Sequence, residues 1–191
     1  MIKKLALIIG FIICLSSCGK DYVYRIEGEL SNLEDQTVYA VFEKDNYKVV
    51  DTVVCTKPGQ FQIDQNEAGF HCVTIFFADK EHWVTAYLEP GETVKITGDA
   101  NSPLLLQVKG GRTNDKLTAF KKKIAPLLTE LTNLSNSLNS KDLNDTIEET
   151  DIAARLANVN MQLSEEAIRY VKENPDEAVS YTHLRAHETG A

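Results

Sequence analysis

Cysteine is the residue of this chain with the clearest chemical potential, because a deprotonated thiol is both a nucleophile and a redox centre. The 191 residues include four cysteines, Cys14, Cys18, Cys55 and Cys72. A thioredoxin-type redox site needs two thiols in a C-x-x-C motif, and no two of these cysteines have that spacing. Cys55 and Cys72 could still form a structural disulfide in an oxidising compartment. We favour two buried free thiols, because these residues fall on strands that need not be neighbours.

The first 17 residues have the organisation of an export signal. Lys3 and Lys4 form a positively charged start, and residues 5–15 are an apolar run too short for a permanent membrane span. Two alternatives remain open: an ordinary secretory signal in which Cys18 is incidental, or an N-terminal helix that stays in the membrane.

The end of this segment, Leu15-Ser16-Ser17-Cys18, resembles the lipobox of bacterial lipoproteins. The resemblance implies that residues 1–17 are removed, that the Cys18 thiol receives a diacylglycerol and that the freed amine is acylated. Three acyl chains would hold the protein permanently, since each buried methylene contributes about 0.8 kcal/mol. We therefore expect Cys18 to be the lipidation site and residues 18–21 to form a lipidated tether. The protein would then lie in the cell envelope, anchored to the inner or outer membrane and facing the periplasm.

Charge excludes one class of partner. The formal net charge is -8 and the sequence pI is about 5.0, whereas nucleic-acid phosphates require a basic surface. We expect the membrane to be a partner through the lipid anchor, an envelope protein to be a further candidate partner, and no nucleic acid to bind.

Residues 22–110 alternate between apolar and polar positions in short runs separated by turns, which predicts an antiparallel β-domain. Lys57-Pro58-Gly59-Gln60 has the chemistry of a type II turn and predicts a hairpin with the strand that follows. The fold class expected is α+β, with an antiparallel β-sandwich or partly open barrel of seven to eight strands followed by a helical hairpin. The strands are expected at Tyr24–Gly28, Gln36–Phe42, Lys48–Cys55, Phe61–Ile63, Cys72–Phe77, Trp83–Leu88 and Thr93–Thr97, with a last one through Leu104, Leu106 and Val108.

Residues 113–175 change to helical periodicity and predict a helical hairpin that serves as a connector. Thr113 or Asn114 is the expected N-cap, and Pro126 is expected to kink the first helix without ending it. Self-association as a coiled coil is the less favoured alternative to packing within the chain. The expected apolar faces are Leu117, Phe120, Ile124, Leu127, Leu131, Leu134 and Leu138 in the first helix, and Ile152, Leu156, Val159, Leu163 and Tyr170 in the second.

The remaining polar and aromatic groups predict no catalytic, cofactor-binding or metal-binding residue. Gly110-Gly111 lacks the Lys and Ser or Thr of a phosphate loop, and His71 and His82 have no ligand spacing around them. Trp83 and Tyr87 are expected to fill a core or a cross-strand pair. The other charged groups are interpreted as solvated helix surface: Glu148, Glu149, Asp151, Glu165, Glu166, Lys121, Lys122 and Lys123.

One further resemblance concerns a family. Residues 24–28, 49–61, 87–91 and 108–114 look like an uncharacterised β-domain, over about residues 22 to 125. It resembles the domain of unknown function that precedes a thioredoxin-like domain, of the alkyl hydroperoxide reductase and thiol-specific antioxidant type, in envelope lipoproteins. The resemblance implies a thiol-disulfide oxidoreductase whose catalytic C-x-x-C lies in a domain that is missing here. The alternative is a stand-alone envelope lipoprotein whose β-domain binds a ligand or partner.

The end of the chain, residues 180–191, resembles translated sequencing-adapter read-through. We therefore expect a non-native tail, with the natural reading frame lost near Val179 or Ser180, and give no weight to the i,i+4 spacing of His183 and His187. A genuine C-terminal tail is the alternative.

Overall fold

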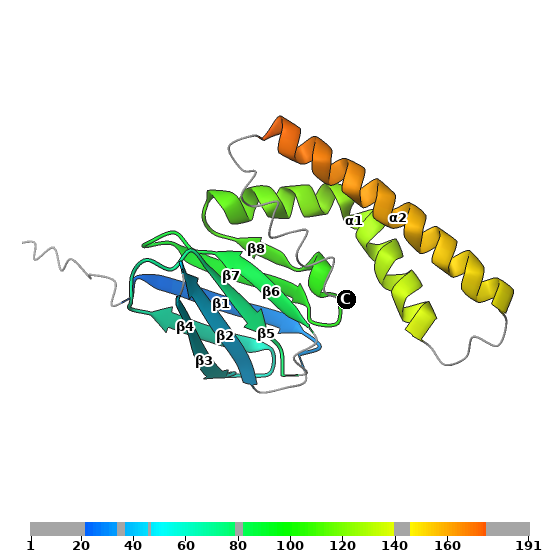
Figure 1. Ribbon diagram of the computed structural model, residues 1–191. Coiled ribbons are helices and arrows are strands. Elements are labelled where there is room, and N and C mark those ends of the chain that lie inside the picture. The colour runs from blue at the N-terminus through cyan, green and yellow to red at the C-terminus, as the bar shows by residue number, and fades with distance from the viewer. Residues whose placement is uncertain (1–21, 34–36, 46, 79–81, 140–145, 175–191) are drawn as a thin grey trace, which may run out of the picture.

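Two four-stranded sheets face each other, and two long helices follow them in the chain (Figure 1). The computed structural model describes residues 22–33, 37–45, 47–78, 82–139 and 146–174; the predicted signal, Cys18, the tether and the tail lie outside them. The α+β prediction is confirmed, and over the described residues the sheets form an open sandwich with no closed barrel.

The first sheet has the strand order β4-β1-β7-β8. The β1–β4 and β7–β8 pairs are antiparallel, but β1 and β7 pair in parallel, with Arg25 opposite Thr93. An antiparallel sheet was the expectation, and this central pair departs from it. The strands are β1 (Tyr24–Ser31), β4 (Gln60–Gln65), β7 (Thr93–Asp99) and β8 (Gln107–Lys109).

The second sheet has the order β3-β2-β5-β6, and every pair in it is antiparallel. Alternate residues of each strand point to opposite faces of a sheet, so Val38, Ala40 and Phe42 point inward and are buried, while Tyr39 and Val41 point outward. The strands are β2 (Thr37–Lys44), β3 (Tyr47–Val54), β5 (Cys72–Phe76) and β6 (Trp83–Tyr87).

The core between the sheets is continuous and apolar. Burying a valine, isoleucine or phenylalanine side chain stabilises the fold by roughly 1.5–3 kcal/mol. The alternating pattern therefore accounts for both the strands and their inner faces. Its completely inaccessible members come from both sheets: Ile26 and Ile96 from the first, and Val38, Ala40, Phe42, Val73, Ile75 and Ala86 from the second.

The Lys57–Gln60 turn forms as predicted, but the predicted hairpin is wrong. The Gln60 N–H donates to the Lys57 carbonyl at 2.9 Å, and Gly59 has the positive φ (74°) that a type II turn requires. However, β3 pairs with β2 and β4 pairs with β1, so the turn carries the chain from the edge of one sheet to the edge of the other. A turn sequence specifies local geometry and not the partner of the strand that follows.

The predicted last strand is partly wrong. Pro103–Leu105 form a short 3-10 helix, η1, and only Gln107–Lys109 pair with β7. Leu106 and Val108 lie in the sandwich core, whereas Leu104 and Leu105 pack against the helical pair. The alternation of Leu104, Leu106 and Val108 predicts a single strand, but the two halves of this segment pack against different cores.

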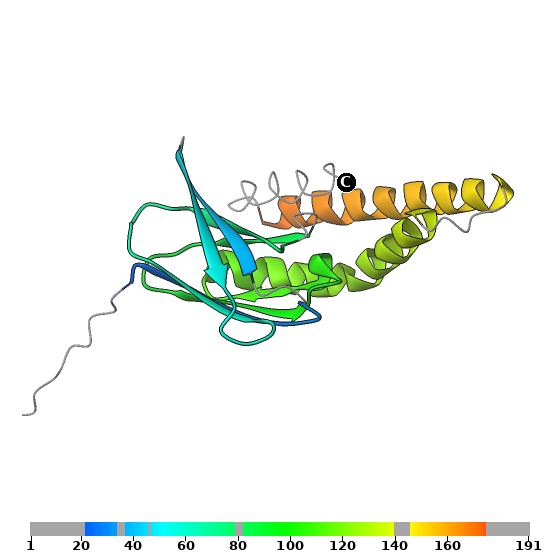
Figure 2. The same ribbon diagram turned by 90° about the horizontal axis from the view of Figure 1, so that it is seen from below.

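The helices are α1 (Arg112–Asn139) and α2 (Thr146–Glu173), and they pack against each other as predicted. Their joint core contains Phe120, Ile124, Val159 and Leu163. Pro126 remains inside α1, where it has no N–H for the carbonyl four residues earlier. Figures 1 and 2 show α1 bending in its middle, so the predicted kink is confirmed. Neither helix is long and apolar enough to cross a membrane.

Candidate functional site

The start of α1 lies across one side of the sandwich and contacts both β8 and β6. Asn114 is buried, although amides are usually exposed. Its side-chain oxygen accepts a hydrogen bond from the Tyr87 N–H at 2.8 Å, and its amide donates to the Tyr87 carbonyl at 2.8 Å. Asn114 therefore replaces the neighbouring strand that the edge strand β6 lacks.

Thr118 does the same for the other sheet. Its hydroxyl accepts from the Val108 N–H at 3.0 Å and also bonds the Val108 carbonyl. Asn114 and Thr118 are four positions apart and so lie on one face of α1. One helix face thus closes the edge of β6 in the second sheet and the edge of β8 in the first.

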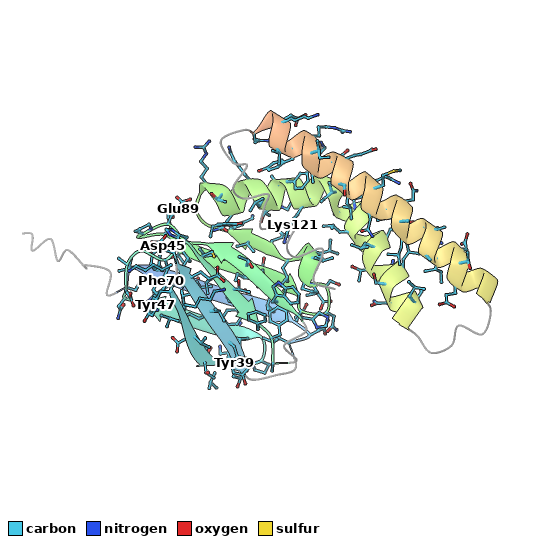
Figure 3. All side chains as sticks on the ribbon, viewed as in Figure 1. Tyr39, Asp45, Tyr47, Phe70, Glu89 and Lys121 are labelled. Carbon is cyan, nitrogen blue, oxygen red and sulfur yellow. The ribbon has the colours of Figure 1, made fainter. Side chains whose placement is uncertain are left out.

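The N-cap prediction is wrong. Helix α1 begins at Arg112, and neither Thr113 nor Asn114 caps it. The Arg112 N–H donates instead to the Glu89 carboxylate at 3.0 Å, and Asp115 accepts from the Gly110 N–H at 3.1 Å. Glu89 comes from the turn after β6 and lies next to the start of α1 (Figure 3). A carboxylate at a helix N-terminus is favourable because the exposed N–H groups carry partial positive charge.

The junction between β8 and α1 requires a glycine at position 110. Its φ is 101°, and a Cβ there would lie 2.1 Å from the Thr93 carbonyl oxygen. The side chain of Asn114 also donates to the Gly110 carbonyl at 2.6 Å. The paired glycines are therefore a structural turn, as the sequence predicted, and their role is to bring α1 close to the sheet edges.

Lys121 lies on the same face of α1, one turn beyond Thr118. The sequence assigned it to the helix surface, but it is half-buried where α1 passes over the sandwich (Figure 3). Burial disfavours its charge and lowers the pKa of the Lys121 amine. Lys122 and Lys123 are exposed as predicted, and Lys123 forms an ion pair with Glu166 of α2 at 3.2 Å.

Cys55 and Cys72 of the β-domain form no disulfide, and their positions are unsuited to redox chemistry with each other. Val54, next to Cys55, pairs with Thr37, whereas Cys72 pairs with Glu43 at the other end of β2. Six residues of strand separate those positions, which is about 20 Å and far beyond disulfide reach. The favoured prediction, two buried thiols without a disulfide, is confirmed for Cys72, whereas Cys55 is only half-buried.

Both thiols are held in the protonated form. Burial raises the pKa of Cys72 to about 11, and the nearby Glu43 carboxylate raises it further, while Lys48 lowers it. Burial also raises the pKa of Cys55. A nucleophilic cysteine requires the opposite environment, one that lowers its pKa. Neither environment activates a thiol as a nucleophile, and the Cys72 thiol donates a hydrogen bond to the Glu43 carboxylate at 4.0 Å.

The outer face of the second sheet carries a row of aromatic residues. The register aligns Tyr39, Phe76 and Trp83 across three strands, and the Phe76 and Trp83 rings are 6.0 Å apart. The cross-strand pair expected of Trp83 is therefore present. Tyr87, four residues after Trp83 on the same strand, is half-buried, and burial raises its pKa to about 12.

The remaining sequence candidates do not converge. His71 is exposed and lies 3.2 Å from the Asp45 carboxylate, and the His82 carbonyl accepts from the Phe77 N–H. Glu149, Asp151 and Glu165 are exposed, whereas the Glu148 side chain lies outside the described residues. Within the part of the chain that the structure describes, no group of three or more His, Cys, Asp or Glu could hold a metal ion.

The fold and the α1 contacts define an α+β module in which a helix closes one side of an open β-sandwich. Residues 24–117 match the model of a family described as "Domain of unknown function (DUF4369)". The match spans all eight strands and the start of α1, including Asn114, so the resemblance to an uncharacterised β-domain is supported over that range. Searches of curated proteins and of solved structures found no match.

Proposed function

We propose that this chain is the anchored, non-catalytic module of an envelope thiol-disulfide oxidoreductase. Cys18 would carry the lipid, the sandwich would be a rigid platform, and a separate thioredoxin-like domain would supply the C-x-x-C. One observation supports a non-catalytic role for the β-domain. Cys55 and Cys72 are about 20 Å apart, and burial raises the pKa of both. The link to a redox partner domain rests on the sequence resemblance alone, and the family match over residues 24–117 supports only the uncharacterised β-domain.

A lipid on Cys18 would hold the sandwich close to the membrane. Tyr24, where β1 starts, is six positions after Cys18, and six residues span at most about 22 Å. The Gly91 N–H donates to the Val23 carbonyl at 2.9 Å, which ties the beginning of the described chain to the turn between β6 and β7. That end of the sandwich would therefore face the lipid.

The helical pair is better suited to providing a docking surface for a domain that follows α2 than to holding that domain away from the sandwich. Tyr170, near the end of α2, stacks on Phe120 near the start of α1, with ring centroids 4.5 Å apart. The chain therefore returns to the sandwich after the hairpin instead of leaving from its far tip (Figure 1). A domain that follows α2 would begin beside the first half of α1, with the hairpin tip projecting past it.

The reading frame beyond Val179 tests the proposed function directly. We expect it to encode a thioredoxin-like domain with a C-x-x-C motif. A stop codon directly after Val179 would contradict the proposal and favour a stand-alone lipoprotein that binds a partner, a role that the exposed valines of β3 also favour.

The anchor has its own test, in which radiolabelled palmitate is fed to cells that express the chain. We expect label on the wild-type chain and none on Cys18→Ser, with the variant lost from the membrane fraction. A Cys55→Ser variant is the matched control and should label normally. Equal membrane association of wild type and Cys18→Ser would rule out the lipid anchor.

A further inference from the structure

The sandwich has four edge strands, and three of them are blocked. The edges of β6 and β8 are bonded by Asn114 and Thr118. On β4, the exposed positions are polar: Gln62 donates to Asp64 at 3.0 Å, and Asp64 pairs with Arg25 of the neighbouring strand at 2.6 Å. Charged and polar groups on an edge strand discourage pairing with another chain.

The fourth edge, β3, also carries charged residues, Lys48 and Asp51, but they do not cover the valines of its outer face. It is eight residues long, contains no proline, and carries Val50 and Val54 on its outer face, each 66% exposed. Lys48 is already paired with Glu43 at 2.7 Å. A long edge strand with exposed β-branched residues is a template for another strand, and this is the one edge of the described sheets that presents such a surface.

The β2–β3 register shows which backbone groups of β3 are available. Lys44 pairs with Tyr47 across a two-residue connection, and residues that flank such a connection exchange both backbone hydrogen bonds. Bonding then alternates, so Val49, Asp51 and Val53 bond to β2. The His71 N–H bonds the Glu43 carbonyl, on the β5 side of β2, which agrees with this alternation. The N–H and C=O groups of Val50, Thr52 and Val54 therefore face the open edge.

The geometry points to a second copy of this chain as the occupant: we propose that β3 pairs antiparallel with β3 of another copy, Val50 opposite Val54 and Thr52 opposite Thr52. Several antiparallel registers satisfy the backbone alternation, and the one centred on Val53 sets Val50 opposite Thr56, beyond the end of β3. Centring on residue 51 sets Asp51 against Asp51, and like charges directly opposite are destabilising. Centring on Val50 leaves Val54 beyond the partner strand. Centring on Thr52 covers all four exposed valines of the two copies.

The pairing joins two second sheets into one continuous sheet of eight strands around a two-fold axis. Valine pairs and a Thr–Thr pair are among the favourable cross-strand combinations, and the contact is isologous, as in most homodimers. The inference uses only described residues and does not depend on the envelope role, so either can fail without the other.

Sedimentation of the full chain in a Cys18→Ser form tests the pairing. We expect the wild-type strand to show a monomer–dimer equilibrium at micromolar concentrations, and V50K/V54K to weaken it at least tenfold by setting lysines against lysines. V50K/V54E is the matched control: in the proposed register each introduced lysine faces an introduced glutamate, so the dimer should be retained. A wild-type chain that stays monomeric at every concentration, or a V50K/V54E variant as monomeric as V50K/V54K, would overturn the proposal. Far-UV circular dichroism checks that each variant is folded.

Cross-linking gives an independent readout of the register. With Cys14, Cys18 and Cys55 replaced by serine, Thr52→Cys should form a covalent dimer under mild oxidation, because the two copies of that position are directly opposite. Asp51→Cys is the control; its position is offset from its own copy and should cross-link much more slowly. Equal cross-linking of both variants, or none from Thr52→Cys, would contradict the register. Capture of an unrelated extended peptide by β3 in place of a second copy would also contradict the proposal.

Discussion

The two sides of the sandwich are closed in different ways. On the α1 side, buried side chains bond the backbone of β6 and β8, and Asn114 is only 2% exposed. On the other side, β3 and β4 meet water, and β3 shows two valines that are 66% exposed. A buried amide that satisfies an edge is a contribution to folding, whereas an uncovered edge is available for association. The difference separates the part of the molecule that maintains the fold from the part that can meet a partner.

The largest expected effect is at Asn114. Replacing it by alanine removes its hydrogen bonds to the Tyr87 N–H, the Tyr87 carbonyl and the Gly110 carbonyl, which costs about 3 kcal/mol in the free energy of unfolding. Urea denaturation monitored by circular dichroism measures the change. Thr113→Ala, on the neighbouring residue, is the control and should change stability by less than about 0.5 kcal/mol. If the two variants were equally stable, the Asn114 hydrogen bonds would contribute little to the stability of the fold.

A smaller effect is expected at Thr118. Thr118→Val keeps the shape and removes the hydroxyl that bonds Val108, and we expect a loss of about 1–2 kcal/mol. Thr118→Ser keeps the hydroxyl and should recover most of that loss. Thermal unfolding of the three proteins side by side distinguishes a hydrogen-bond contribution from a packing contribution, because a packing role would make serine the worse substitution.

On the open side, Asp64 of β4 forms an ion pair with Arg25 of β1, and the strength of this pair depends on pH. The Arg25 guanidinium lowers the pKa of Asp64 in the folded state, and Gln62 adds to this effect. The stabilisation is present above the unfolded pKa of about 4 and is lost as pH falls toward the lower folded value. The difference in denaturation midpoint between wild type and Asp64→Asn should therefore be small at pH 7, because the pair is partly exposed, and should shrink below pH 4. A difference that grows on acidification would contradict this.

The smallest effect on stability is expected at Val50. Its side chain is mostly in water already, so Val50→Thr should change the free energy of unfolding of the monomer by less than about 0.5 kcal/mol. Val38→Thr, on the adjacent strand but completely buried, is the contrasting variant and should cost several times more. Measurements at low protein concentration keep self-association out of the comparison.

Much of the fold follows from local pattern, and the reason is visible in particular elements. Alternation located the strands, and the apolar stripes located both helices, because each pattern reports a face buried against a neighbour. The sequence also showed both faces of residues 48–55 to be partly apolar; the structure separates a core face, with Val49 and Val53, from an exposed face at an open edge.

The site was harder to predict, because its contacts are long-range. Asparagine is a typical N-cap residue, and nothing near Asn114 in the sequence indicates that its partner is Tyr87, 27 positions earlier. The sheet assignment of β4 failed for the same reason. The available signal was the i,i+4 spacing of Asn114 and Thr118, which places both polar side chains on the same helix face as Leu117. Cys18 lies outside the described residues and stays a prediction.

The parallel pair at the centre of the first sheet has a consequence for how the chain folds. Arg25 of β1 needs Thr93 of β7 as a neighbour, 68 positions later, and contacts of such separation slow folding because a long loop must close before they form. The β2–β3 hairpin, by contrast, closes over two residues and is able to form early. The open β3 edge would therefore be exposed before the sandwich is complete. A newly made chain would then have its greatest tendency to associate in the period before β1 pairs with β7.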